Sequence, residues 1–228
     1  ATPEKDLLLI RRNAKLLESW QVRTGKRKGA WTYAQAKHRS SGDNSNAQFA
    51  LLALHEAERV GVEISNQTWR LAHSYWVRTQ RPEGAWGYYE GLPGTGSMTC
   101  AGITSLVITS GQLSKGDASI LGGAVQCCGQ QEQGDELERA LQWMGTHFSA
   151  SGNPTAAGQN VSRAWWLYYL YGVERVGRLT GRRFLGVHDW YRKGAKILVG
   201  EPQDKLRGYW KGTGHAESNP VIATSLAL

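Results

Sequence analysis

Asp43 and His215 are the residues in this sequence whose types best suit acid–base chemistry. Each lies where the pattern predicts the start of an apolar helix, beside backbone N–H groups that have no partner within the helix. If these helix starts meet at one end of the fold, the carboxylate and the imidazole could exchange protons with a bound substrate. We therefore expect Asp43 and His215 to be the catalytic pair if the chain has an enzymatic activity.

Other polar and aromatic side chains lie near the same predicted helix starts. Arg163 could hold a carboxylate or a phosphate through paired hydrogen bonds. Aromatic residues around Trp166, together with Phe49, could line a cavity that suits an isoprenoid or a sugar stacked on an indole ring. The expected ligand-binding residues are Asn46, Tyr88, Thr99, Cys100, Arg163, Trp166 and Asn219. A simpler alternative stays open, in which the Asn and Thr residues are helix caps and the aromatic residues are core.

We expect no metal and no cofactor. Cys100 with His215 alone falls short of a zinc site, which needs at least three ligands from the protein. The three cysteines include the adjacent pair Cys127 and Cys128, which indicates no disulfide framework.

The composition is that of an ordinary soluble protein, except for ten Trp and twenty-eight Gly residues. The formal charge of +8 fits a solvated basic surface, or attraction to an anionic partner. We do not expect nucleic-acid binding, because the positive charge is the only feature of the sequence that favours it. No apolar run approaches the roughly 20 residues that a membrane span needs. The compartment is left open, export from a bacterial cytoplasm included.

The elements that would position these residues are helices. Hydrophobic spacing predicts helices at about 4–20, 46–60, 66–80, 98–110, 135–148, 160–171 and 187–199, and another that opens at about 215–220. The weakly patterned stretch 111–134 is expected to hold one short helix at about 117–127. Amphipathic and nearly all-apolar helices alternate, as a two-layer array of helical hairpins requires.

A turn of the form Gly-x-Trp joins several of these helices. The pattern Gln80, Gly84, Trp86 recurs as Gln203, Gly208, Trp210, and Gly29 with Trp31 forms an earlier version. The glycine permits a close approach of the backbone, and the indole can then cover the end of the next helix. We interpret these Trp residues as structural staples, and we count about four units of outer helix, turn and inner helix.

The element Gln80-Arg-Pro-Glu-Gly84-Ala-Trp86 in a helical-hairpin array resembles the squalene–hopene cyclase and protein prenyltransferase superfamily of α/α toroids. The resemblance covers nearly the whole chain through its repeats. It implies an all-α fold, a small or incomplete α/α toroid of about four hairpins with Gly-x-Trp turns. In such a toroid the inner helices begin around one mouth of a central cavity, where Asp43, Arg163 and His215 would lie.

The chain also resembles the toroid segment of large bacterial proteins in which a cyclase-like helical domain precedes another domain. On this reading residues 1–228 form a single terpenoid-cyclase-like domain, a fragment of a longer protein whose other domains are its partners.

The catalytic signatures of the superfamily are absent from the sequence. Its cyclases protonate their substrate through an Asp-x-Asp-Asp motif, whereas the six Asp residues here are isolated. Its prenyltransferases bind zinc through Asp-x-Cys and a distant His, and no Asp-x-Cys occurs. We therefore expect a toroid module that binds a small molecule, either isoprenoid or carbohydrate, or a protein segment. The alternative is a divergent enzyme, terpenoid cyclase-like or carbohydrate-active, that uses Asp43 and His215.

Overall fold

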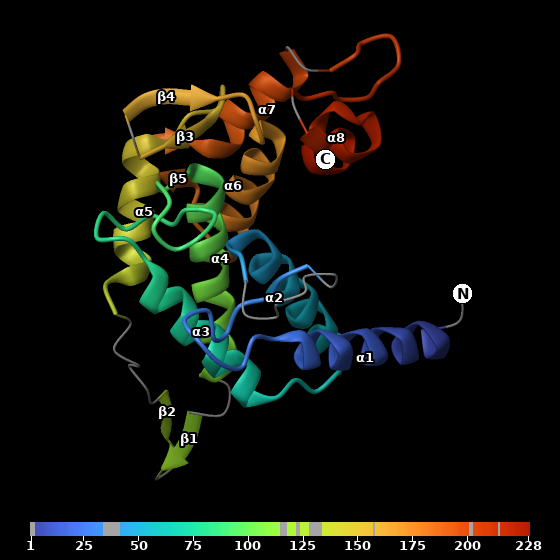
Figure 1. The fold of residues 1–228 in the computed structure, drawn as a ribbon, viewed down its shortest axis with the longest axis vertical. Helices are drawn as coiled ribbons and strands as arrows, with labels where there is room; N and C mark the ends of the chain where they lie inside the picture. The colour runs from blue at the N-terminus through green and yellow to red at the C-terminus, as the bar shows by residue number, and fades with distance from the viewer. Residues whose placement is uncertain are drawn as a thin grey trace. The chain divides into compact units, whose positions relative to one another are not determined.

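The computed structural model describes residues 3–33, 42–114, 118–121, 124–127, 134–156, 158–200, 203–213 and 215–228. The side chains of residues 118–121, 124–127, 158–161 and 215 lie outside that description. The described chain is mostly helical, with strands confined to short hairpins (Figure 1).

Most helices occur where the hydrophobic spacing predicts them, and the two exceptions are described below. The helices are α1 (Pro3–Trp20), α2 (Asn44–Arg59), α3 (Asn66–Thr79), α4 (Gly96–Leu113), α5 (Glu136–His147), α6 (Trp166–Thr180), α7 (Trp190–Gly200) and α8 (Pro220–Ala227), with a 3-10 helix η1 at His215–Ser218. The strands form antiparallel pairs: β1 (Ala118–Leu121) with β2 (Ala124–Cys127), β3 (Asn153–Thr155) with β4 (Gly158–Ser162), and β5 (Phe184–Leu185) with β6 (His188–Asp189). No helix in the described ranges is long and apolar enough to cross a bilayer.

The contacts within the chain divide it into two compact units. The first unit comprises Ala1–Thr79 and Ser105–Glu136, and the second comprises Gln80–Thr104 and Leu137–Leu228. The first unit therefore holds α1, α2, α3 and the end of α4, and the second holds the start of α4 and the helices α5 to α8. The expectation of one domain over residues 1–228 stays a prediction.

The Gly-x-Trp turns have the same geometry in both units. In the first unit the Gln21 amide donates to the carbonyl of Gly29 over 3.2 Å, and in the second the Gln80 amide donates to the carbonyl of Gly84 over 3.0 Å. Both glycines have a positive φ, +102° and +92°, which a residue with a side chain adopts only with strain. The glutamine that ends the outer helix thus fixes the turn that follows it.

The tryptophan indoles attach these turns to the outer helices. Trp31 donates its Nε1 hydrogen to the carbonyl of Leu17 in α1 over 2.7 Å. Trp210 donates in the same way to the carbonyl of Leu198 in α7 over 2.8 Å. Each bond satisfies a carbonyl near the end of a helix, where no partner remains within the helix itself.

The backbone of the tryptophan attaches the turn to the inner helix. The Trp86 N–H donates to the hydroxyl of Thr99 in α4 over 3.3 Å, and the Trp210 N–H donates to the hydroxyl of Thr224 in α8 over 3.1 Å. The Trp86 ring also lies directly on Gly102, where an added Cβ would come within 2.3 Å of it. The interpretation of these tryptophans as staples is therefore confirmed.

Two predictions from the sequence were wrong, one of an element's type and one of a helix start. The short helix expected at about 117–127 is replaced by the hairpin of β1 and β2. The helix expected from residue 160 begins at Trp166, because residues 158–162 form β4 and pair with β3. Trp165 separates the two elements with a φ of 58°, and it is the one residue other than glycine with a positive φ in the described chain.

Candidate functional site

Asp43 caps the start of α2. Its side chain is only 1 % exposed, and both of its oxygens are engaged by one residue. Oδ1 accepts the Asn46 backbone N–H over 2.8 Å, and Oδ2 accepts the Asn46 side-chain amide over 2.8 Å. His215 belongs to η1, but its side chain lies outside the described residues. The pairing of Asp43 with His215 for acid–base chemistry therefore stays a prediction.

Thr99 and Cys100 lie in the interior of the second unit. The Thr99 hydroxyl donates to the carbonyl of Thr95 over 2.7 Å while it accepts the Trp86 N–H. Cys100 is fully buried with its Sγ 3.9 Å from Sδ of Met144, and this burial raises the pKa of the thiol. Both residues secure the start of α4 beneath its Gly-x-Trp turn.

Tyr88 and Asn219 are more accessible. The Tyr88 ring is half-buried and meets the edge of the Tyr89 ring at a centroid distance of 4.7 Å. The Asn219 side chain accepts the Val221 N–H over 2.9 Å and so caps α8, which then opens on proline, as helices often do.

The structure brings Arg163 and Trp166 together at the start of α6. The Arg163 guanidinium lies over the Trp166 ring, 4.5 Å from its centroid, in a cation–π contact. Trp166 is buried and donates its indole N–H to the carbonyl of Ala150 over 2.8 Å. Trp165, beside it, is 40 % exposed, and its ring meets the edge of the Tyr168 ring.

Glu217 is a buried carboxylate at the same helix start that the sequence reasoning did not include in the site. It is 0 % exposed, and its Oε1 accepts the Tyr168 N–H over 2.8 Å. Its Oε2 has no hydrogen-bond partner among the described residues. Burial raises the pKa of Glu217, although the N–H groups at the start of α6 act in the opposite direction. No spacing rule connects this position with α6, so the sequence carries no signal for the contact.

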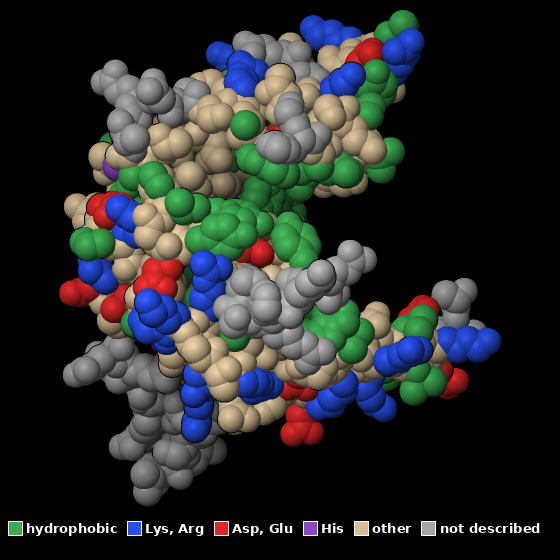
Figure 2. Space-filling model, in the orientation of Figure 1, with side chains coloured by type: hydrophobic (Ala, Val, Ile, Leu, Met, Phe, Trp, Pro, Cys, Tyr) green, Lys and Arg blue, Asp and Glu red, His purple; other side chains and the backbone are tan. Residues whose placement is uncertain are grey.

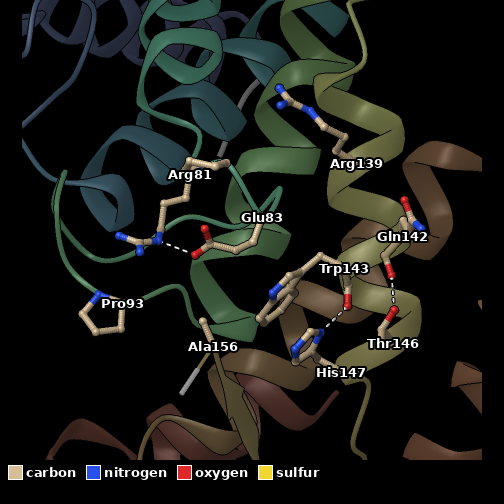
Figure 3. A pocket seen from close by; sticks show the side chains of 10 residues that line it. Arg81, Glu83, Pro93, Arg139, Gln142, Trp143, Thr146, His147 and Ala156 are labelled. Carbon is tan, nitrogen blue, oxygen red and sulfur yellow. Dashed lines mark hydrogen bonds and ion pairs between the residues drawn. The ribbon is translucent and has the colours of Figure 1, made fainter. Parts of the chain in front are cut away.

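A pocket of about 710 Å³ lies against the outer helix α5 (Figure 3). We call it the α5 pocket. Its lining comes from the Gln80–Trp86 turn, from the loop after it and from α5: Arg81, Pro82, Glu83, Pro93, Arg139, Gln142, Trp143, Thr146, His147 and Ala156. None of these residues was expected in a site, because they lie beside the Gly-x-Trp turn and not at an inner helix start.

A second cavity, of about 400 Å³, lies among α6, α7 and α8, and we call it the α6–α8 groove. Its lining is mainly aliphatic and aromatic: Leu170, Tyr171, Val173, Glu174, Arg178, Trp190, Tyr191, Gly194, Ala195, Leu198, Val199, Trp210 and the last residues of α8 with Leu228. No residue of α7 is fully buried, although its apolar side chains gather on one side. The groove is therefore the uncovered apolar face of α7.

A smaller cavity of about 250 Å³ lies between α1 and α2 in the first unit, and we call it the α2 pocket. Its lining is Leu17, Trp20, Trp31, Thr32, Tyr33, Asn46, Phe49, Ala50 and Ala53. The structure thus places two residues that the sequence singled out, Asn46 and Phe49, on one aromatic pocket.

The described residues contain no group of three or more His, Cys, Asp or Glu side chains that could hold a metal ion. The face of α1 that is visible in Figure 2 carries Lys and Arg side chains beside Asp and Glu side chains. It has no stripe of a single sign of the kind that nucleic-acid binding would favour.

No protein-family model and no curated protein matches the sequence. The structure is similar to that of Candida albicans protein geranylgeranyltransferase-I complexed with GGPP, with a TM-score of 0.57 and 13% sequence identity over 93% of this chain. The chain spans 57% of the length of that protein. The fold is thus all-α and of the prenyltransferase α/α-toroid type, which confirms the fold that the Gln80–Trp86 motif implied. At this identity the likeness establishes the fold and not the activity.

Proposed function

We propose that this protein is a toroid module that binds an isoprenoid chain in the α6–α8 groove. The observation that carries the proposal is the aromatic and aliphatic lining of that groove, on a fold similar to that of a prenyltransferase complexed with GGPP. Its volume of about 400 Å³ lies within the range of known small-molecule pockets.

Two tryptophans form rigid walls of the groove. Trp190 lies on Gly177 of α6, where a Cβ would come within 2.1 Å of the ring, and it donates its indole N–H to the carbonyl of Arg182. Trp210 is held by its bond to the carbonyl of Leu198. Because both indole N–H groups are already bonded, the rings offer apolar surface to a ligand.

The polar groups of the groove favour an isoprenoid over a carbohydrate. Arg178 and Glu174 pair with each other across 3.3 Å on successive turns of α6. A sugar presents several hydroxyl groups that each need a partner when they leave water. An isoprenoid chain needs none, and its burial contributes roughly 25 cal/mol for each Å² of apolar surface.

Binding without turnover is supported by the sequence, which has neither an Asp-x-Asp-Asp motif nor an Asp-x-Cys pair. The alternative of an enzyme that uses Asp43 and His215 stays a prediction. Incubation with GGPP followed by product analysis distinguishes the two readings. Recovery of unchanged GGPP supports a binding module, whereas conversion that Asp43→Asn abolishes would support the enzyme.

Calorimetric titration with geranylgeraniol tests the proposal. Leu198→Gln places an amide in the groove, and Leu206→Gln makes the same change at a residue that is 91 % exposed in the loop before Trp210. We expect the first variant to bind about five- to thirtyfold more weakly, since losing most of a leucine contact costs roughly 1–2 kcal/mol. The second should bind like the wild type. Absence of saturable binding to the wild type, or equal binding by Leu198→Gln, would overturn the proposal.

A further inference from the structure

We propose that the α5 pocket is a second binding site, which takes the oxyanion of a ligand that bears a carboxylate or a phosphate group. The pocket is distinct from the α6–α8 groove, with which it shares no lining residue. Three of its side chains would contact the oxyanion: Trp143, Arg81 and His147.

Trp143 supplies a hydrogen-bond donor directed into the pocket. Its side chain is 4 % exposed, and its Nε1–H makes no hydrogen bond within the part of the chain that the structure describes. Figure 3 shows the indole nitrogen on the side of the ring that faces the space bounded by Glu83, Pro93 and Ala156. The indole nitrogen is open to the pocket, so a ligand acceptor at this point can take its hydrogen bond in place of water.

Arg81 supplies a cation whose position is fixed. Its Nε pairs with the Glu83 carboxylate, and its Nη1 donates to the carbonyl of Leu92 over 3.0 Å. Its Nη2 makes no hydrogen bond with the described residues. A guanidinium held in this way binds an oxyanion with little further loss of side-chain freedom.

His147 lies flat on the indole of Trp143, with ring centroids 4.2 Å apart and planes 9° apart. Its Nδ1 is 2.9 Å from the carbonyl oxygen of Trp143. Because a carbonyl only accepts, Nδ1 must carry a hydrogen, and Nε2 is the nitrogen left for a ligand. In this tautomer Nε2 can accept a hydrogen bond from a protonated phosphate.

The charged side chains of the pocket lining are two arginines and one glutamate. The lining contains the cations Arg81 and Arg139 and one carboxylate, Glu83, which pairs with Arg81. Arg139 is held nearby, since its Nη2 donates to the Gln80 side chain over 2.7 Å. The donors that the lining can offer to an oxyanion are thus the Arg81 Nη2 group and the Trp143 indole N–H.

The test is an NMR titration of the whole chain, which follows the indole N–H resonance of Trp143. That resonance is assigned as the one that disappears in Trp143→Phe. Inorganic phosphate and acetate are added in separate arms, and sodium chloride at the same ionic strength is the reference. Arg81→Gln is compared with Arg192→Gln, the same change at an exposed arginine of α7 outside the pocket.

We expect a saturable shift of the Trp143 resonance that chloride does not produce. Arg81→Gln should weaken binding about tenfold, as the loss of a charge-assisted hydrogen bond predicts, while Arg192→Gln should not change it. If both phosphate and acetate saturate the shift of the Trp143 resonance, the site binds oxyanions of either kind. If only one of them does, the site is supported and that anion identifies the ligand group as a phosphate or a carboxylate. If neither anion saturates the resonance, or if Arg192→Gln weakens binding as much as Arg81→Gln, the proposal is overturned. Should Arg81→Gln fail to fold, loss of measurable phosphate binding in Trp143→Phe by calorimetry supports the site, and unchanged binding overturns it.

Discussion

Replacing Gly84 by alanine tests whether the Gly-x-Trp turn holds α5 in place. Gly84 has a φ of +92°, and a Cβ at this position would lie 2.6 Å from the carbonyl oxygen of Arg139 in α5. The carbonyl carbon of Arg139 would be 2.8 Å away. Because these are backbone atoms of a helix, they cannot move aside as a flexible side chain can. The turn or the helix must shift.

The expected loss in the free energy of unfolding has two parts. The positive φ costs about 1–2 kcal/mol with a side chain present, and the reduced freedom of the unfolded chain offsets roughly 0.4–1 kcal/mol of this. Forcing an extra methyl group into a packed contact adds about 1–3 kcal/mol. Gly84→Ala should therefore destabilise the protein by about 3 kcal/mol in sum.

Gly91→Ala is the matched control in the same unit. Gly91 has a φ of +87°, almost the same as that of Gly84, but a Cβ there would meet nothing within 4 Å. This variant should lose only the part of the free energy of unfolding that comes from the positive φ, about 1 kcal/mol. Urea unfolding followed by circular dichroism measures both variants. Equal losses for Gly84→Ala and Gly91→Ala would refute the claim that contact with α5 makes this glycine necessary.

Other buried groups give predictions of their own. Asp43→Ala should lower the free energy of unfolding by about 1–2 kcal/mol because it removes a helix cap, while Asp43→Asn should cost much less; equal losses in urea unfolding would exclude capping as the cause. Because burial raises the pKa of Glu217 above its ordinary value of 4.5, the folded state should lose stability as pH rises through that raised pKa. Urea unfolding at about pH 4 and about pH 7 should then show that the free energy of unfolding of Glu217→Gln rises relative to that of the wild type at the higher pH. A difference in free energy between the two proteins that does not change with pH would contradict this. Cys100, whose thiol pKa is raised by burial, should resist alkylation in the native protein and react in urea, as mass spectrometry of its peptide can show; rapid native labelling would be inconsistent with this burial.

The helical framework could be predicted because its signals are local. The spacing of apolar residues indicates each helix, and the pattern Gln80, Gly84, Trp86 indicates how one hairpin turns. The structure gives this pattern a physical basis, since the glutamine amide bonds the glycine carbonyl and the tryptophan N–H bonds the inner helix. A motif of this kind is readable because the hydrogen bonds that close its turn lie within one hairpin.

One of the two errors lies at a short-range turn signal. Residues 118–121 and 124–127 flank the dipeptide Gly122-Gly123, a sequence typical of a hairpin, yet the stretch was expected to be helical. The start of α6 was predicted too early because the aromatic run around Trp166 was extended back through β4. The left-handed conformation of Trp165, which marks the true start, has no sequence signal for a residue of this type.

The candidate sites were harder to predict because residues far apart in the chain form them. The α5 pocket joins the turn at Arg81 with side chains of α5, and Glu217 reaches the start of α6 from η1. Neither contact follows from a spacing within one element. The sequence singled out Asn46 and Phe49, but it did not indicate that they share a pocket with Trp20, Trp31 and Tyr33.

The binding of an isoprenoid in the α6–α8 groove is the central claim, and intermolecular NOEs test it most directly. Protein labelled with ¹³C at the leucine methyl groups is mixed with geranylgeraniol, and contacts to the ligand protons are recorded. We expect NOEs to Leu198 and Leu170, which line the groove. NOEs confined to Leu17 of the α2 pocket, or no NOEs at ligand saturation, would contradict it.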